Sequence, residues 1–105
     1  MTDVNRKRIT PEMRISRMEE IFDKALDIIG RAKECPEEFF MFQSEIRKLE
    51  KYYTGRSWRK DFELDEQGKL PKDLKRGVLS EDGVYNLLER NKELLEELQG
   101  EDTDD

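Results

Sequence analysis

Four carboxylates stand close together at Asp61, Glu63, Asp65 and Glu66, which raises the question of a divalent-cation site. Calcium in helix–loop–helix motifs takes oxygen ligands at fixed loop positions, with glycine at the sixth and a bidentate glutamate at the twelfth. Counted from Asp61, these positions hold Glu66 and Lys72, so the calcium motif is absent. We expect a solvated loop here, with no metal ion and no other cofactor.

Groups for covalent catalysis are scarce. The chain has no histidine and one cysteine, so the usual general base and the commonest zinc ligand are missing. Cys35 has no histidine to activate it, and we expect a buried or incidental thiol. Ser80 is expected to cap a helix. The sequence therefore predicts that the chain is not an enzyme and has no catalytic residue.

Aromatic and basic residues alternate between positions 52 and 62 and form a candidate interaction surface, with Tyr52, Tyr53, Trp58, Arg59 and Phe62 as its members. Proteins that bind single strands stack aromatic rings on bases and place cations on phosphates. Residues 56–76, however, carry seven basic against five acidic residues, which is a weak field. Nucleic-acid binding is therefore the alternative here, and anchoring of a connector by its aromatic residues is the simpler explanation.

A second candidate surface lies in the run from Phe39 to Phe42. Phe39 and Phe42 follow the helical spacing of a buried seam, whereas Phe40 and Met41 point elsewhere on a helix. They either contact the connector or form an exposed apolar patch, and such patches tend to be interfaces.

Apolar spacing indicates the elements that must position these residues. Hydrophobic residues make up 34% of the chain and charged residues 44%, which suits helices with narrow apolar stripes. Thr10 and Pro11 offer a cap and a first-turn proline, so a helix should start near residue 11. We predict an all-α fold with one domain, a coiled-coil-like bundle of three antiparallel helices over residues 11–34, 36–54 and 80–99.

Pro36 leaves two layouts open. Proline at a first helical position, followed by Glu37 and Glu38, indicates a new helix and therefore a hairpin, which we favour. The apolar spacing nevertheless continues through Pro36, which would also suit one long helix kinked at this proline. That helix would be only half covered by the returning last helix, so the chain would have to dimerise.

Residues 55–79 show no sustained helical period, and their aromatic and leucine residues predict an ordered connector that lies on the bundle. The last helix begins with Ser80 as its cap, and Leu79 and Val84 occupy the two positions of a hydrophobic staple. Asn91 takes a seam position, where a polar side chain fixes register or oligomeric state.

Charge is uneven along the chain. The net charge is −6, and residues 80–105 contain ten acidic and two basic residues. Such a segment is also compatible with an acidic mimic of nucleic acid that inhibits a basic site. We expect flexible ends at about residues 1–9 and 100–105, no membrane span and a cytoplasmic location.

The stretch from Tyr52 to Leu88, and above all Gly77-Val78-Leu79-Ser80-Glu81-Asp82, resembles a small bacterial family known as domain of unknown function 4298. The segment Met18–Ile21 resembles it more loosely. The resemblance implies a bacterial or phage cytosolic protein and carries no activity, substrate or catalytic residue.

The function that we predict rests mostly on the catalytic groups that the sequence lacks. Helical seams, a polar seam residue and missing catalytic groups predict a non-enzymatic protein–protein interaction module that self-associates or binds a protein partner. Nucleic-acid binding by the connector and acidic mimicry of nucleic acid are the alternatives.

Overall fold

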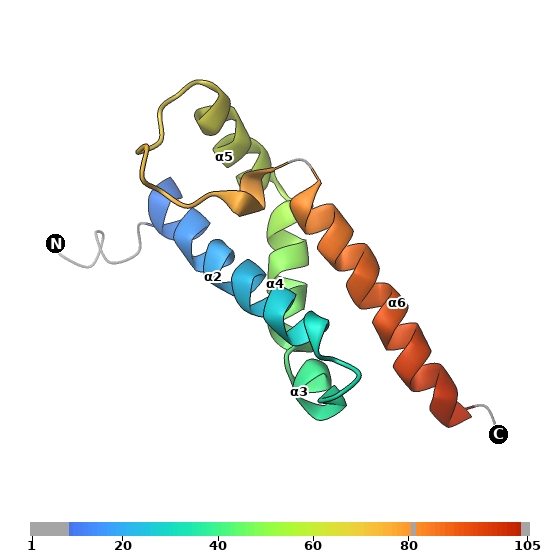
Figure 1. Cartoon of the computed structure of the whole chain (residues 1–105). Helices are drawn as coiled ribbons and strands as arrows, with labels where there is room; N and C mark the ends of the chain where they lie inside the picture. Colours follow the sequence, from blue (N-terminus) through green and yellow to red (C-terminus); the bar gives the residue numbers. More distant parts are fainter. Residues whose placement is uncertain (1–8, 81, 104–105) are drawn as a thin grey trace, which may run out of the picture.

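The structure is a computed structural model that describes residues 9–80 and 82–103. Within these ranges the chain forms five α-helices, one short 3-10 helix and no strand, which confirms the all-α prediction (Figure 1). The elements are α2 (Pro11–Gly30), α3 (Pro36–Met41), α4 (Gln43–Tyr53), α5 (Arg56–Glu66), η1 (Gly77–Leu79) and α6 (Gly83–Thr103).

Helix α2 begins where its capping signals predict. The Thr10 hydroxyl accepts the backbone N–H of Met13 at 3.1 Å, and Pro11 is the first helical residue. The helix ends at Gly30, four residues before the predicted end at position 34, because residues 31–34 form a turn. Arg31 in this turn donates two hydrogen bonds of 3.0 Å to the carboxylate of Glu38.

Pro36 starts a new helix, so the hairpin layout is correct and the single kinked helix is wrong. The helix predicted for residues 36–54 is divided at Phe42 into α3 and α4. Helix α4 then runs back along α2 in the opposite direction (Figure 1). This places the start of α2 beside the end of α4.

The predicted connector over residues 55–79 is wrong in its first half, where α5 occupies residues 56–66. The helical period was hidden because the buried position of α5 is a charged residue, Asp61. Residues 67–80, which we call the strap, remain non-helical except for η1. Leu70, Val78 and Leu79 are buried, so the strap packs on the bundle.

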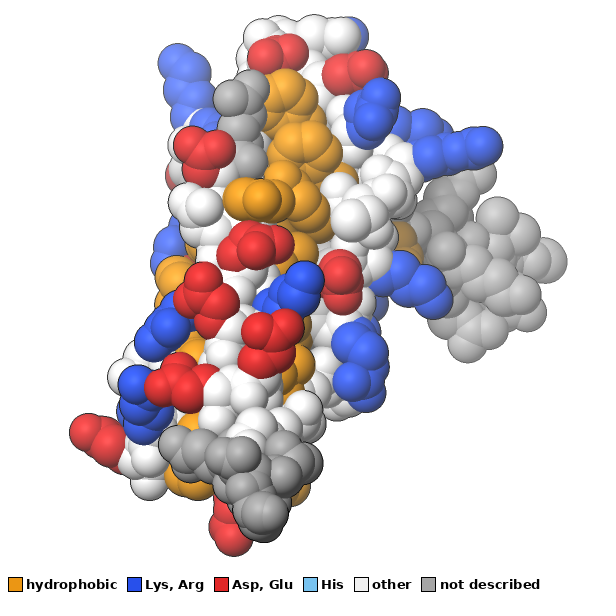
Figure 2. Space-filling model, turned by 90° about the vertical axis from the view of Figure 1, so that its right-hand side faces the viewer, with side chains coloured by type: hydrophobic (Ala, Val, Ile, Leu, Met, Phe, Trp, Pro, Cys, Tyr) orange, Lys and Arg blue, Asp and Glu red, His pale blue; other side chains and the backbone are white. Residues whose placement is uncertain are grey.

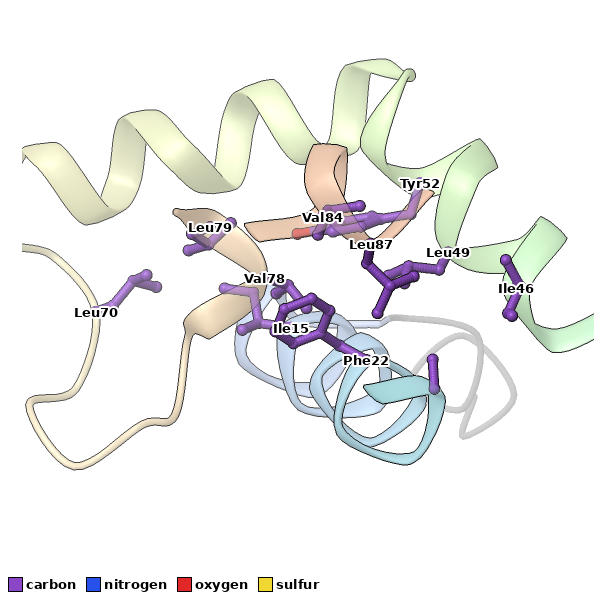
Figure 3. Packing of buried hydrophobic residues seen from close by; sticks show 11 residues of the cluster. Ile15, Phe22, Ile46, Leu49, Tyr52, Leu70, Val78, Leu79, Val84 and Leu87 are labelled. Carbon is purple, nitrogen blue, oxygen red and sulfur yellow. The ribbon is translucent and has the colours of Figure 1, made fainter. Parts of the chain in front are cut away.

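Two apolar clusters hold the elements together. The larger one receives side chains from α2, α4, the strap and α6, which point toward one another in Figure 3. Its buried members are Ile15, Phe22, Ala25, Ile46, Leu49, Tyr52, Leu70, Val78, Leu79, Val84 and Leu87. The smaller cluster, nearer the α2–α3 turn, consists of Ile28, Ala32, Phe39 and Leu94.

Helix α6 begins at Gly83, three residues after its predicted start at residue 80. It also continues past its predicted end at residue 99, since Gly100 is helical and the helix reaches Thr103. Residues 1–8 and 104–105, which belong to the ends expected to be flexible, lie outside the described residues. None of the helices described is long and apolar enough to cross a membrane.

Candidate functional site

Two side chains hold the strap by bonding both polar backbone groups of Val78. Its N–H donates to Glu19 Oε1 at 3.0 Å, and its carbonyl accepts Trp58 Nε1 at 2.8 Å. Glu19 is buried on α2, and Trp58 belongs to α5. These two bonds, from Glu19 and Trp58 to Val78, hold the strap between α2 and α5, and we call them the clamp. The indole N–H of Trp58 is therefore already hydrogen-bonded inside the protein.

Two glycines of the strap region are explained by close packing. A Cβ atom at Gly77 would lie 3.1 Å from Glu19 Oε2, and one at Gly83 would lie 2.5 Å from Ser80 Oγ. Ser80 lies three positions before the first residue of α6, and its hydroxyl still caps that helix: it accepts the N–H of Gly83 at 3.1 Å and donates to the carbonyl of Gly77 at 2.9 Å. These contacts give a structural role to Gly77, Ser80 and Gly83 within the stretch that resembles the family.

The predicted register residues of α6 all face the interior. Leu79 and Val84 are buried in the larger cluster. Asn91 is also buried and exchanges two amide hydrogen bonds, of 3.0 and 2.9 Å, with Gln43 of α4. This pair joins α4 to α6 within one chain.

A polar cluster joins α2, α4 and α5. Asp61 is fully buried, and its carboxylate accepts Arg14 Nε at 2.9 Å, Arg14 Nη2 at 2.6 Å and the Tyr52 hydroxyl at 2.8 Å. The hydrogen bond to Asp61 raises the pKa of Arg14. Burial, and then the bond to Asp61, raises the pKa of Tyr52. Asp61 is thus a structural anion and cannot serve the calcium site considered for this segment.

The first predicted surface is only partly brought together. Tyr53, Trp58 and Phe62 form an aromatic ladder, with ring centroids 5.1 Å apart in the edge-on first pair and 5.0 Å apart in the stacked second pair. All three rings are half-buried, and Arg59 is exposed. Tyr52 is buried in the polar cluster instead.

The second predicted surface lies at the other end of the molecule, on α3 (Figure 1). Phe40 is 38% exposed and Met41 is 81% exposed, so neither packs against the connector as a core residue would. The Phe40 ring lies 5.6 Å from that of the buried Phe39. Phe40 and Met41 therefore form a small apolar tip apart from the aromatic ladder.

A groove between α4 and α6, which we call the α4–α6 groove, has a volume of about 410 Å³. Its apolar lining comes from Ile46, Leu88 and Leu95, and the Gln43–Asn91 pair crosses it. Its charged lining consists of Arg47, Glu50, Glu89 and Lys92. Seen from the side of α6, hydrophobic side chains reach the surface in the upper half and acidic ones crowd the lower half (Figure 2).

A second concavity, which we call the basic pocket, lies between α2, α4 and the start of α5 and has a volume of about 600 Å³. Its basic members are Arg14, Arg17, Lys48, Lys51 and Arg56, against the acids Glu20 and Glu45. Sequence reasoning missed this site. The available signal was a pair of basic residues three positions apart on each of two helices, which places each pair on one helix face.

The structure also places the lone thiol and the acidic residues that the sequence offered for chemistry. We expected a buried or an incidental thiol at Cys35, and of these two the buried one is wrong, because Cys35 is exposed at the start of α3. Among the described residues, no three cysteine, aspartate or glutamate side chains are grouped to hold a metal ion. The polar side chains of Glu19, Asp61 and Asn91 bond to distant parts of the chain and stabilise the fold.

The model of the family described as "Domain of unknown function (DUF4298)" matches residues 15–99. The chain belongs to the DUF4298 family. No curated protein and no solved structure matches it. The matched DUF4298 region contains the strap with its clamp, the α4–α6 groove and all of the basic pocket except Arg14.

Proposed function

We propose that this DUF4298 chain is a non-enzymatic protein-interaction module that binds an amphipathic helix of a partner protein in the α4–α6 groove. The observation that carries this proposal is the make-up of the groove. Leu88 and Leu95 are seven positions apart on α6 and face Ile46 of α4, which gives an apolar floor parallel to the helices. An amphipathic helix recognises such a floor through apolar residues one and two turns apart.

The charged walls of the groove favour a protein helix of mixed charge. Arg47 and Glu50 lie three positions apart on α4, and Glu89 and Lys92 lie three positions apart on α6. Within the described residues, none of these four side chains takes part in an ion pair. A partner helix with both signs of charge along its flanks can pair with each wall. Such exposed pairs fix orientation more than affinity.

The aromatic ladder supports the same function. Tyr, Trp and Arg are the residue types most enriched among the side chains that dominate binding energy at interfaces. Tyr53 and Trp58 are half-buried, and Arg59 beside them is exposed. We therefore include the ladder in the partner surface, whereas binding of bases is less favoured because the Trp58 ring is half-buried and already stacked on Phe62.

A non-enzymatic role is supported by the absence of histidine from the sequence and by the structural use of Asp61, Glu19 and Tyr52. A bacterial source and a cytoplasmic location are what the family resemblance implies. An exposed lone thiol at Cys35 is compatible with a reducing compartment.

The test uses a tagged chain produced in its own cells, with co-purified proteins quantified by mass spectrometry. The double variant Arg47→Glu and Lys92→Glu reverses one charge on each wall of the groove. The matched control, Lys60→Glu with Lys69→Glu, makes the same change in net charge at exposed positions elsewhere. We expect a defined partner to be retained by the wild type and the control and to be lost from the groove variant.

Oligomeric state is measured in parallel by sedimentation across a concentration series. A dimer that the groove variant abolishes would identify a second copy of the chain as the occupant. Proteins captured equally by the two double variants, together with a strictly monomeric chain, would contradict the proposal.

A further inference from the structure

The basic pocket lies on elements that meet because α2 and α4 run in opposite directions. Arg17 comes from the first half of α2, Lys51 from the last turn of α4 and Arg56 from the first position of α5. The fold thus brings cations from three separate elements to one concavity.

The pocket is lined mainly by basic residues, although the chain as a whole is acidic. The whole chain carries −6, yet five basic and two acidic side chains line this pocket. Arg14 is committed to Asp61, and Lys48 pairs with Glu45 at 3.1 Å. Within the described residues, Arg17, Lys51 and Arg56 make no ion pair. Their mutual repulsion has no internal counter-charge beyond Glu20, and an anion in the pocket would relieve it.

Phosphate suits this arrangement better than a single carboxylate. A phosphate monoester carries close to two negative charges at neutral pH and three strong acceptor oxygens. Guanidinium groups such as those of Arg17 and Arg56 bond phosphate oxygens in pairs, while lysine supplies a point charge. The start of α5 adds a small positive potential, and the first turn of this helix contains no acidic residue.

The dimensions and floor indicate a small ligand. A volume of about 600 Å³ falls within the range of roughly 300–1,000 Å³ typical of small-molecule sites. Met18 and Ile21 are half-buried and supply apolar lining beside the cations. We infer that the basic pocket binds the phosphate group of a small phosphorylated molecule and packs the organic part of that molecule on this apolar lining. This inference is independent of the α4–α6 groove.

The test is a titration of the full chain followed by NMR of backbone amides and by calorimetry, at constant ionic strength. The probes are inorganic phosphate, adenosine monophosphate and acetate. We expect saturable shifts around the pocket with adenosine monophosphate binding most tightly, phosphate next and acetate not measurably. Each of Arg17→Ala, Lys51→Ala and Arg56→Ala should weaken phosphate binding about tenfold, as expected for loss of one charge-assisted bond.

Lys60→Ala is the matched control, because Lys60 is an exposed cation on the same helix as Arg56 but outside the pocket. It should bind phosphate as the wild type does, and so should the Arg47→Glu, Lys92→Glu variant. Circular dichroism checks that the alanine variants are folded, which is expected since the three side chains are exposed. No saturable binding, equal binding of acetate, or unchanged affinity in the three variants would overturn the inference. Tighter binding of a short single-stranded oligonucleotide would also overturn it by assigning the pocket to nucleic acid.

Discussion

The polar cluster of Arg14, Tyr52 and Asp61 makes a sharp prediction about stability. Replacing Arg14 with methionine keeps much of the apolar stem but removes the guanidinium. The Asp61 carboxylate, which is 0% exposed, would then keep one hydrogen bond from a neutral hydroxyl in place of three. Removing one partner of a buried ion pair costs roughly 3–5 kcal/mol. Arg14 is 24% exposed, so water can enter behind it, and we expect about 3 kcal/mol.

Removing the negative charge of Asp61 should lower the free energy of unfolding by less than removing the guanidinium of Arg14. In Asp61→Asn the arginine can turn toward solvent, and the Tyr52 hydroxyl can still donate to the amide oxygen, so the expected cost is about 1–2 kcal/mol. In the Arg14→Met background the same change removes an uncompensated buried charge. It should therefore be neutral or stabilising there, which corresponds to a coupling free energy of about 2 kcal/mol between the two sites.

Urea unfolding of the wild type, both single variants and the double variant, followed by circular dichroism, measures these values. Similar slopes for the four proteins would show that the variants unfold from comparable native states. The reasoning would be refuted by a cost of less than about 1 kcal/mol for Arg14→Met, or by an equal effect of Asp61→Asn in both backgrounds.

Because the pKa of Tyr52 is raised in the folded state, the bound proton stabilises the fold below the unfolded pKa of about 10, and this stabilisation is lost as the pH rises above it. The stability difference between wild type and Tyr52→Phe should thus shrink between about pH 8 and about pH 11 in urea melts, and a constant difference would contradict this. Trp58→Phe removes the bond to the strap carbonyl and should cost about 1 kcal/mol, whereas an unchanged unfolding midpoint would show that the clamp contributes nothing. Gly30→Ala meets no atom within 4 Å at the end of α2 and should stabilise by about 0.5 kcal/mol. Gly83→Ala would press on the hydroxyl that caps α6 and should destabilise by about 1–2 kcal/mol, so the same sign for both glycine variants would contradict the packing argument.

Local signals in the sequence predicted where α2 and α3 begin, but not where α4 and α5 begin. Each of these signals acts on residues only a few positions away, so it can be recognised in the sequence. They are the cap and proline at Thr10 and Pro11, Pro36 at the start of α3 and the capping hydroxyl of Ser80. The residues predicted to face the interior at the last helix do so, as the burial of Leu79, Val84 and Asn91 shows.

Long-range polar contacts explain what the sequence did not predict. Helix α5 was missed because its buried position is Asp61, whose partner Arg14 lies 47 positions away. Burial of Glu19 could not be expected either, since its bonding partner is in the strap. The basic pocket combines residues of three elements, so it exists only once the hairpin direction is known. The exposure of Phe40 and Met41 could not be predicted either, because it depends on which other elements cover α3.

The clamp on Val78 also bears on how the molecule opens. Its amide proton is held by the carboxylate of Glu19, 59 positions earlier in the chain, while its carbonyl is held from α5. Fraying of any one helix end leaves the Glu19 bond in place. Solvent exchange of this proton should therefore require release of the strap from α2, and its rate should approach that of the slowest core amides. Val78 would then report, from outside any long helix, on the cooperative unfolding of the whole domain.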